Sequence, residues 1–245
     1  MTNKYKYFVA NWKMYGGLST VNSLHRVIKF LKTFKKSKNI KIVYCPPSTL
    51  IRPMSKKLLN TTIQVGAQNC HESQNYGAST GYINSSMLKS VGAKYVILGH
   101  SENRQSGETD KLINLKIKAA IKSGLKVIFC IGETLSQKRK KITKQILSKQ
   151  IKSGLNKVQK RKNIIIAYEP VWSIGTGVIP KPDELFRTID FIKKKVKNSK
   201  VLYGGSVNPK NIHELKLINN INGFLVGGAS QQSKKFIDII KKTFI

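Results

Sequence analysis

The chain has 245 residues, and 40% of them are hydrophobic, which is enough for a sizeable core without disulfides or a structural metal. No apolar window approaches the roughly 18 residues of a membrane span, and Cys45, Cys70 and Cys130 indicate neither a disulfide framework nor a zinc site. The formal net charge of +34 must attract anions. We expect a soluble, unprocessed protein of a reducing cytoplasm.

Eight short strand-like segments, each an apolar run that ends in glycine or polar residues, follow one another along the chain. Between several of them, apolar residues recur at helical spacing, as in Leu24, Val27, Ile28 and Leu31. A second such series comprises Ile142, Ile146, Leu147, Ile151 and Leu155. The predicted strands lie in KYFVANWK, IKIVYCPP, TIQVGAQN, KYVILGHS, LKVIFCIGE, NIIIAYEP, SKVLYGGS and NGFLVGGAS.

Strands that alternate with helices imply parallel strands joined by crossovers, and runs without polar alternation imply strands covered on both faces. Eight such units in a chain of this length match a (β/α)8 barrel. The alternative is a doubly wound open sheet, but its usual G-x-G-x-x-G after the first strand is missing. We therefore predict an α/β fold, a (β/α)8 barrel, in which residues 1–245 form a single domain.

The C-terminal ends of barrel strands form the face where active sites lie. Asn11 and Lys13 follow the first predicted strand, His100 the fourth and Glu169 the sixth. Singly, such a glutamate is more often the structural partner of a lysine, and such a histidine a satisfied core residue. Their convergence favours catalysis, with Glu169 as a base beside a carbonyl and with His100 and Lys13 stabilising the developing negative oxygen.

Glycine pairs follow the last two predicted strands, in GGSV at residues 204–207 and VGGAS at residues 226–230. Glycine allows a ligand to approach the backbone closely, and successive amides there bind anions. Barrels often bind phosphate at these two strand ends, so the pairs predict a phosphorylated substrate.

Removing a proton beside the carbonyl of a phosphorylated substrate gives an enediolate, which must be shielded from water because it can eliminate its phosphate. The loop after Glu169 has the composition of a lid that provides this shielding. In this interpretation Pro170 and Val171 stiffen one hinge, Trp172 and Ile174 form an apolar underside, and Gly175 offers an amide to the phosphate. The alternative is an ordinary loop with a packed tryptophan. The predicted lid comprises Pro170, Val171, Trp172, Ser173, Ile174, Gly175, Thr176 and Gly177.

These residues resemble the triosephosphate isomerase family along essentially the whole chain, which implies a TIM barrel and that family's isomerase activity. Several of the motifs are specific by themselves, and their order leaves little room for another family. The matching segments are NWKM from Asn11, GAQN from Gly66, GHSE from Gly99, CIGETL from Cys130, YEPVW from Tyr168, IGTG from Ile174, YGGSV from Tyr203 and LVGGAS from Leu225.

The resemblance implies that Glu169 moves a proton between the two carbons of dihydroxyacetone phosphate and D-glyceraldehyde 3-phosphate, and that His100 is the neutral electrophile. Lys13 and Asn11 are similar to the family's substrate-binding pair. No metal and no organic cofactor is implied. The positions that match the family's phosphate-binding residues are Gly175, Ser206, Gly227 and Gly228.

Four further positions resemble supporting residues of the family. Glu102 is similar to a second carboxylate near Lys13, and Ser101 to the hydroxyl that holds the base while the lid is open. Ile174 and Leu225 are similar to an apolar clamp over the base.

The family also implies a homodimer, in which a loop similar to the segment from Gln68 to Thr80 reaches the partner's active site. Thr80 matches the residue that supports the partner's Asn11 and Lys13. The chain departs from the pattern at Tyr82 and Asn103, where the family has a glutamate and an arginine that pair across the interface. We hypothesise that a neutral contact replaces the pair, since this avoids an unpaired buried charge.

Two further departures lie at Tyr15, where asparagine is usual, and at residues 177–180, where a hinge containing lysine is commoner.

The positive charge has two interpretations, nucleic-acid binding and a compositional origin. Basic residues are spread along the chain and are nearly all lysine, so we favour a compositional origin and expect no specific nucleic-acid partner and no membrane partner. The basic residues at positions 138–141 are then expected on a solvated helix face. The rival functions are a different sugar-phosphate isomerase or epimerase, and a non-catalytic protein that binds RNA in a salt-dependent way.

Overall fold

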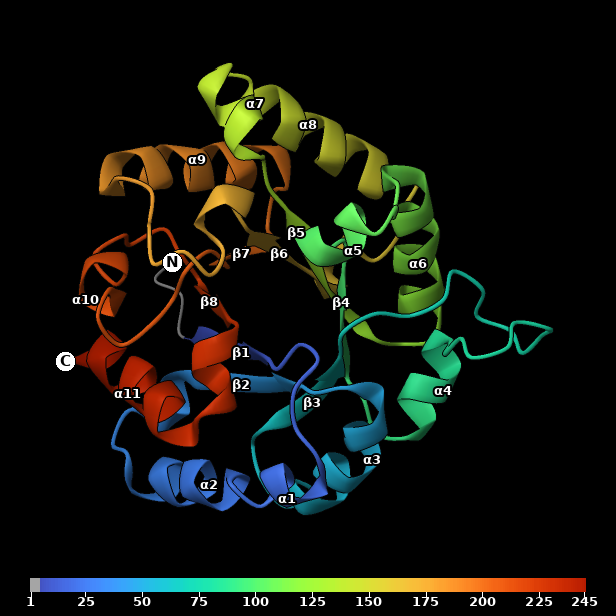
Figure 1. The fold of residues 1–245 in the computed structure, drawn as a ribbon, viewed down its shortest axis with the longest axis vertical. Coiled ribbons are helices and arrows are strands. Elements are labelled where there is room, and N and C mark those ends of the chain that lie inside the picture. The colour runs from blue at the N-terminus through green and yellow to red at the C-terminus, as the bar shows by residue number, and fades with distance from the viewer. Residues whose placement is uncertain (1–4) are drawn as a thin grey trace.

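The computed structural model describes residues 5–245, so part of the segment on which the expectation of an unprocessed N-terminus rests lies outside it. Eight parallel strands pair in chain order, and β1 also pairs with β8, which closes the barrel. Figure 1 looks into this barrel and shows the helices surrounding it. The predicted barrel is confirmed. Its strands are β1 Lys6–Asn11, β2 Ile40–Cys45, β3 Gln64–Ala67, β4 Tyr95–Leu98, β5 Lys126–Ile131, β6 Ile164–Tyr168, β7 Lys200–Tyr203 and β8 Gly223–Val226.

The helices lie between the strands and turn their apolar positions towards the barrel. In α2 the residues Leu24, Val27 and Phe30 are buried, and in α8 Leu147 and Ile151 are, as the helical spacing predicts. The helices are α1 Leu18–Val21, α2 Leu24–Thr33, α3 Ser48–Lys57, α4 Ser85–Ser90, α5 Ser101–Gln105, α6 Asp110–Lys122, α7 Leu135–Arg139, α8 Thr143–Gly154, α9 Pro182–Lys195, α10 Ile212–Leu215 and α11 Ser233–Phe244. Short 3-10 turns are η1 Ser37–Asn39, η2 Arg161–Asn163, η3 Val171–Ser173 and η4 Gly228–Gln231.

Each strand buries side chains on both of its faces, which explains its continuous apolar run. In β1, for example, Tyr7 and Val9 belong to the apolar cluster inside the barrel, whereas Phe8 and Ala10 belong to the layer between the barrel and the helices. The two layers make the strand ends rigid supports for the side chains that follow them. The inner cluster comprises Tyr7, Val9, Val43, Cys45, Tyr95, Ile97, Ile128, Cys130, Ile165, Ala167, Leu202 and Leu225.

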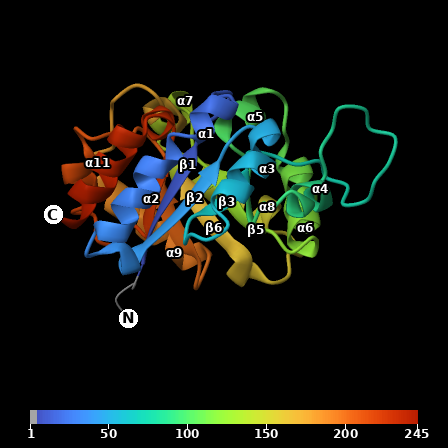
Figure 2. The same ribbon diagram turned by 90° about the horizontal axis from the view of Figure 1, so that it is seen from below.

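One loop extends away from the barrel, between β3 and α4, and Figure 2 shows it protruding beyond the helices. Tyr76 and Tyr82 in this loop expose 73% and 66% of their surface, which is unusual for aromatic side chains. Among the helices of residues 5–245, none combines the length and the apolar character that a bilayer crossing requires.

Candidate active site

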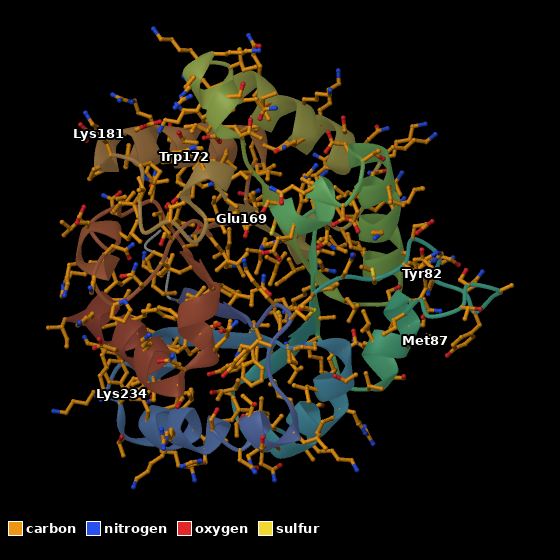
Figure 3. All side chains as sticks on the ribbon, in the orientation of Figure 1. Tyr82, Met87, Glu169, Trp172, Lys181 and Lys234 are labelled. Atoms are coloured by element: carbon orange, nitrogen blue, oxygen red, sulfur yellow. The ribbon has the colours of Figure 1, made fainter. Side chains whose placement is uncertain are left out.

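Glu169 follows β6 directly and lies near the centre of the fold, as Figure 3 shows. Its N–H donates to the carbonyl oxygen of Ile131 at 2.8 Å, which extends the pairing of β6 with β5 by one residue. Two glycines make room for it: a Cβ on Gly132 would lie 1.8 Å from the Glu169 carbonyl oxygen, and one on Gly204 would lie 2.8 Å from its Cγ. The neighbouring strand ends thus fix the position of this carboxylate.

The Glu169 side chain is almost completely buried, and its Oε2 has no hydrogen-bond partner within residues 5–245. Burial raises the pKa of this carboxyl above its usual range, against the opposing effects of His100, Cys130 and Lys13. A carboxylate that is poorly solvated and has a raised pKa is a stronger proton acceptor than an exposed one. The environment therefore suits a general base.

The ring of His100 is oriented so that its Nε2 edge points towards Glu169. It caps α5, where its Nδ1 accepts the backbone N–H of Glu102 at 3.2 Å, so the neutral ring carries its proton on Nε2. That Nε2 lies 3.4 Å from Oε1 of Glu169. Arg104 braces the turn before the histidine, because its Nε donates to the carbonyl oxygen of Gly99 at 2.8 Å. His100 can therefore donate a hydrogen bond into the site while it remains neutral.

Lys13 adopts a left-handed backbone conformation with φ of 56°, which costs about 1 kcal/mol or more for a residue with a side chain. Two contacts hold it there: its N–H donates to Oδ1 of Asn11 at 3.0 Å, and its carbonyl oxygen accepts from Nε2 of Gln68 at 2.8 Å. Its Nζ lies 2.5 Å from Oε1 of Glu102. The strained turn and the carboxylate together aim one cation at the mouth of the barrel.

A cavity of about 200 Å³ joins these groups at the C-terminal ends of the strands. Its charged lining side chains are Lys13 and Glu169, and His100 stands beside them. The structure therefore brings together most of the positions that the sequence analysis singled out. These are Asn11, Lys13, His100, Glu169, Ile174, Gly175, Ser206, Leu225, Gly227 and Gly228.

Ser101 and Glu102 do not line this cavity. Glu102 contacts Lys13, as expected, but is about half exposed. Ser101 is buried at the start of α5, and within the described chain its hydroxyl makes no hydrogen bond to Glu169. With the base turned to His100, the structure does not test the expected contact of Ser101 with a withdrawn base.

The predicted lid lies against the cavity, where Ile174 and Gly175 contribute to its wall. Ser173 is completely buried and ties the loop down: its Oγ lies 2.9 Å from the hydroxyl of Tyr203, and it accepts the N–H of Ser206 at 3.2 Å. Gly175 and Gly177 have φ of 74° and 83°, the left-handed region that favours glycine. The loop is thus anchored at Ser173 and is open to solvent around Thr176.

Of the two residues predicted to form the underside of the lid, Ile174 lines the cavity and Trp172 does not. Nε1 of Trp172 donates to Oε1 of Glu133 at 2.9 Å, and Nζ of Lys138 lies 3.7 Å above its ring. Lys138 also lies 2.9 Å from Oε1 of Glu184. The expectation that this lysine lies on a solvated face is therefore wrong, because it packs between the lid and α9.

Sequence reasoning missed the support that Glu133 gives to the loop. Its carboxylate is buried and accepts hydrogen bonds from the Tyr168 hydroxyl and the Trp172 indole. The motif CIGETL contains this glutamate, but nothing in the motif says what it contacts. The cavity-lining positions beyond the predicted site residues are Gly204, Gly205, Val207, Asn208 and Ala229.

Comparisons with known proteins point in the same direction. A family model described as triosephosphate isomerase matches residues 6–243. Similar relatives are the triosephosphate isomerases of Thermodesulfovibrio yellowstonii and Carboxydothermus hydrogenoformans, each 42% identical over 96% of this chain and 98% of the relative. The crystal structure of triosephosphate isomerase from Bartonella henselae is similar, with a TM-score of 0.88 and 32% identity over 98% of this chain and 99% of that one.

Proposed function

This chain belongs to the triosephosphate isomerase family and interconverts dihydroxyacetone phosphate and D-glyceraldehyde 3-phosphate, and from that premise we propose that Glu169 is the base of the reaction. The observation that carries the proposal is the buried Glu169 carboxylate facing Nε2 of His100 at 3.4 Å inside a small cavity. At about 200 Å³ the cavity lies below the ~300–1,000 Å³ of sites for drug-sized ligands, so it selects a small substrate.

In this mechanism Glu169 removes a proton from one of the two adjacent carbons that carry the hydroxyl and carbonyl oxygens, and delivers it to the other carbon. The hydroxyl oxygen loses its proton and the carbonyl oxygen gains one, so that the carbonyl group moves from one carbon to its neighbour. The carbonyl oxygen gains negative charge as the proton leaves. Nε2–H of His100 and the Lys13 ammonium stabilise that charge, which is a contribution made mainly in the transition state. Asn11 supports Lys13 through its Oδ1.

The glycine-rich part of the cavity wall suits the phosphate. Gly175, Ser206, Gly227 and Gly228 line the cavity, and backbone amides at such positions are suited to an anion. Ile174 and Leu225 are the apolar wall beside the base. Isomerisation of D-glyceraldehyde 3-phosphate by the purified protein, beside a Glu169→Gln variant, tests the whole assignment.

The contact of Lys138 with Trp172 predicts a role in holding the lid closed. Lys138→Met keeps the aliphatic stem but removes the cation that lies above the ring and pairs with Glu184; the contact with the ring is worth about 0.5–1 kcal/mol. We expect kcat/KM to fall about two- to fivefold and the release of inorganic phosphate per turnover to rise, because an open lid exposes the enediolate to elimination. Both quantities are measured in the same assay.

The exposed Lys140 provides the matched control for this prediction, since Lys140→Met changes charge and size equally on the same segment. If phosphate release is unchanged in Lys138→Met, or rises equally in both variants, Lys138 does not hold the lid closed.

A homodimer built around the protruding loop between Gln68 and Thr80 is part of the proposal. Apolar side chains near this loop are exposed in the isolated chain, and Figure 3 shows Tyr82 and Met87 on the same side of the molecule. Exposed apolar surface of this kind is typical of protein interfaces. The exposed residues are Met14, Tyr15, Tyr76, Tyr82, Ile83 and Met87.

The surroundings of Asn103 support a neutral contact at this interface. Nδ2 of Asn103 lies 3.5 Å from Oε1 of Glu108, a carboxylate that already bonds Lys116 and Asn69. Because no arginine stands at position 103, an acid introduced at Tyr82 would lack the cationic partner that the family has there, and the interface would bury an unpaired charge.

Tyr82→Glu is therefore expected to weaken the dimer by about 2 kcal/mol, or about 30-fold in its dissociation constant. Sedimentation over a concentration series measures it. Adding Asn103→Arg to this variant should restore most of the affinity, and Leu217→Glu, an exposed change in the loop that follows α10, should leave it unchanged. An unaltered dimer in Tyr82→Glu would refute the neutral contact.

A cytoplasmic location and a single domain over residues 1–245 complete the proposal. Cys45, Cys70 and Cys130 are free and buried, and burial raises the pKa of the Cys45 and Cys130 thiols, which keeps them protonated and inert. Free thiols are typical of a reducing compartment.

A further inference from the structure

A second cavity, of about 1260 Å³, lies beside the predicted phosphate end of the active site, and the mechanism does not use it. We call it the basic groove. It is formed by α2, by the segment after β7 and by α11. Figure 3 shows Lys234 at the edge of the fold, on α11, away from Glu169 at its centre. The groove is lined by Arg26, Asn208, Pro209, Lys210, Gly228, Ala229, Gln232, Lys234, Lys235, Ile237, Asp238 and Lys241.

The groove carries a strong excess of positive charge. Its cations are Arg26, Lys210, Lys234, Lys235 and Lys241, and its acid, Asp238, is already paired with Lys242 at 2.9 Å. Charge alone does not make it a site, since a cavity of about 280 Å³ elsewhere is lined by Lys118, Lys122, Lys157 and Lys160. A second property is needed to set the groove apart.

That property is continuity with the active site. Asn208, Gly228 and Ala229 line both the groove and the small catalytic cavity. Gly228 has no side chain to stand between the two cavities, and the space beside it is open, because a Cβ placed there would meet no atom within 4 Å. A ligand that places one phosphoryl group at the end of the catalytic cavity can therefore extend others over Gly228 into the groove.

We propose that the basic groove binds the distal phosphoryl groups of small polyphosphates, and that such ligands compete with the triose phosphate substrate. The proposal rests on the proposed function only for the position of the first phosphoryl group. Lysine ammonium groups on flexible stems suit a chain of phosphates, because each binds as a mobile point charge. A ligand with one phosphate fills the catalytic cavity alone and gains nothing from the groove.

Inhibition by orthophosphate, pyrophosphate and tripolyphosphate tests the proposal at constant ionic strength, without divalent cations, because added salt screens exposed charges. For the unaltered protein, tripolyphosphate should compete with D-glyceraldehyde 3-phosphate at a concentration at least about tenfold lower than orthophosphate. Lys234→Ser with Lys235→Ser should raise the tripolyphosphate inhibition constant about tenfold and leave kcat and the orthophosphate constant within about twofold.

Lys149→Ser with Lys152→Ser, two exposed lysines of α8, is the matched control for total charge, and its inhibition constants should equal those of the unaltered protein. Equal changes in both double variants would mean that the net charge and not the groove binds the ligand. Inhibition that does not strengthen with phosphate chain length, or that does not compete with substrate, would also overturn the proposal. If the protein showed no isomerase activity, calorimetric titration with tripolyphosphate would test the groove independently of the proposed function.

Discussion

Glu169→Gln is expected to lower kcat by about 10³-fold, since a positioned general base contributes about 10²–10⁴-fold to a proton transfer. The change preserves the shape of the side chain and removes its capacity to accept a proton from carbon. In deuterium oxide the unaltered protein should introduce solvent deuterium into the product, because a base that exchanges its proton returns a solvent-derived one. The variant should lose isomerisation and this exchange together.

The pH dependence follows from the raised pKa of Glu169. The base must be ionised, so kcat/KM of the unaltered enzyme should fall as the pH drops through that raised value, at a higher pH than the ~4.3 of an ordinary glutamate. The acid limb of the profile reports this group directly. It should be absent from the residual activity of the glutamine variant.

The same burial predicts a gain in stability for the variant. A group whose pKa is raised by folding stabilises the fold while it is protonated, and this contribution is lost as the pH rises through the folded-state pKa. Near neutral pH the buried Glu169 charge therefore destabilises the fold, and Glu169→Gln should raise the melting temperature. The difference should shrink towards pH 4. A variant that was inactive and also less stable at neutral pH would indicate a structural role for this carboxylate.

The fold was predictable because its signals are local. Each apolar run that was assigned to a strand contains one, and the run LKVIFCIGE contains β5 at Lys126–Ile131. In a barrel the end of a strand determines where the next residue points, so placing His100 and Glu169 at one mouth needed only strand order. The cavity that joins them agrees with that reasoning.

The supports of the site were not predictable in the same way. Trp172, Glu133 and Lys138 come from a 3-10 turn, a strand end and a short helix, and their contacts depend on side-chain directions that no periodicity encodes. The lysine-rich composition concealed Lys138 in particular, because one packed lysine resembles its solvated neighbours in sequence. The basic groove was not predictable from sequence either, because α2 and α11 are far apart in the chain and meet only in the folded barrel.

Lys13→Met is expected to lower kcat/KM by about 10³-fold, at the upper end of the effect of removing one group that stabilises a developing oxyanion. Methionine has a similar length and the same difficulty with a φ of 56°, so the strained turn changes little. The loss comes from the missing positive charge in a small cavity where Glu169 supplies a negative one. Steady-state kinetics should show a fall in kcat and a rise in KM together.

Glu102→Gln tests the ion pair by removing the negative charge beside Lys13. In the structure Nζ of Lys13 lies 2.5 Å from Oε1 of Glu102. Because Glu102 is about half exposed, this pair is worth little on its own, at most about 1 kcal/mol, and kcat/KM should stay within about fivefold of the unaltered value. The field of Lys13 acts mainly on the cavity, where burial makes it stronger than at the surface. If Glu102→Gln were as damaging as Lys13→Met, the ion pair would be the functional unit. If Lys13→Met kept more than about a tenth of kcat/KM, His100 alone would stabilise the enediolate, and the strain stored at Lys13 would have no catalytic purpose.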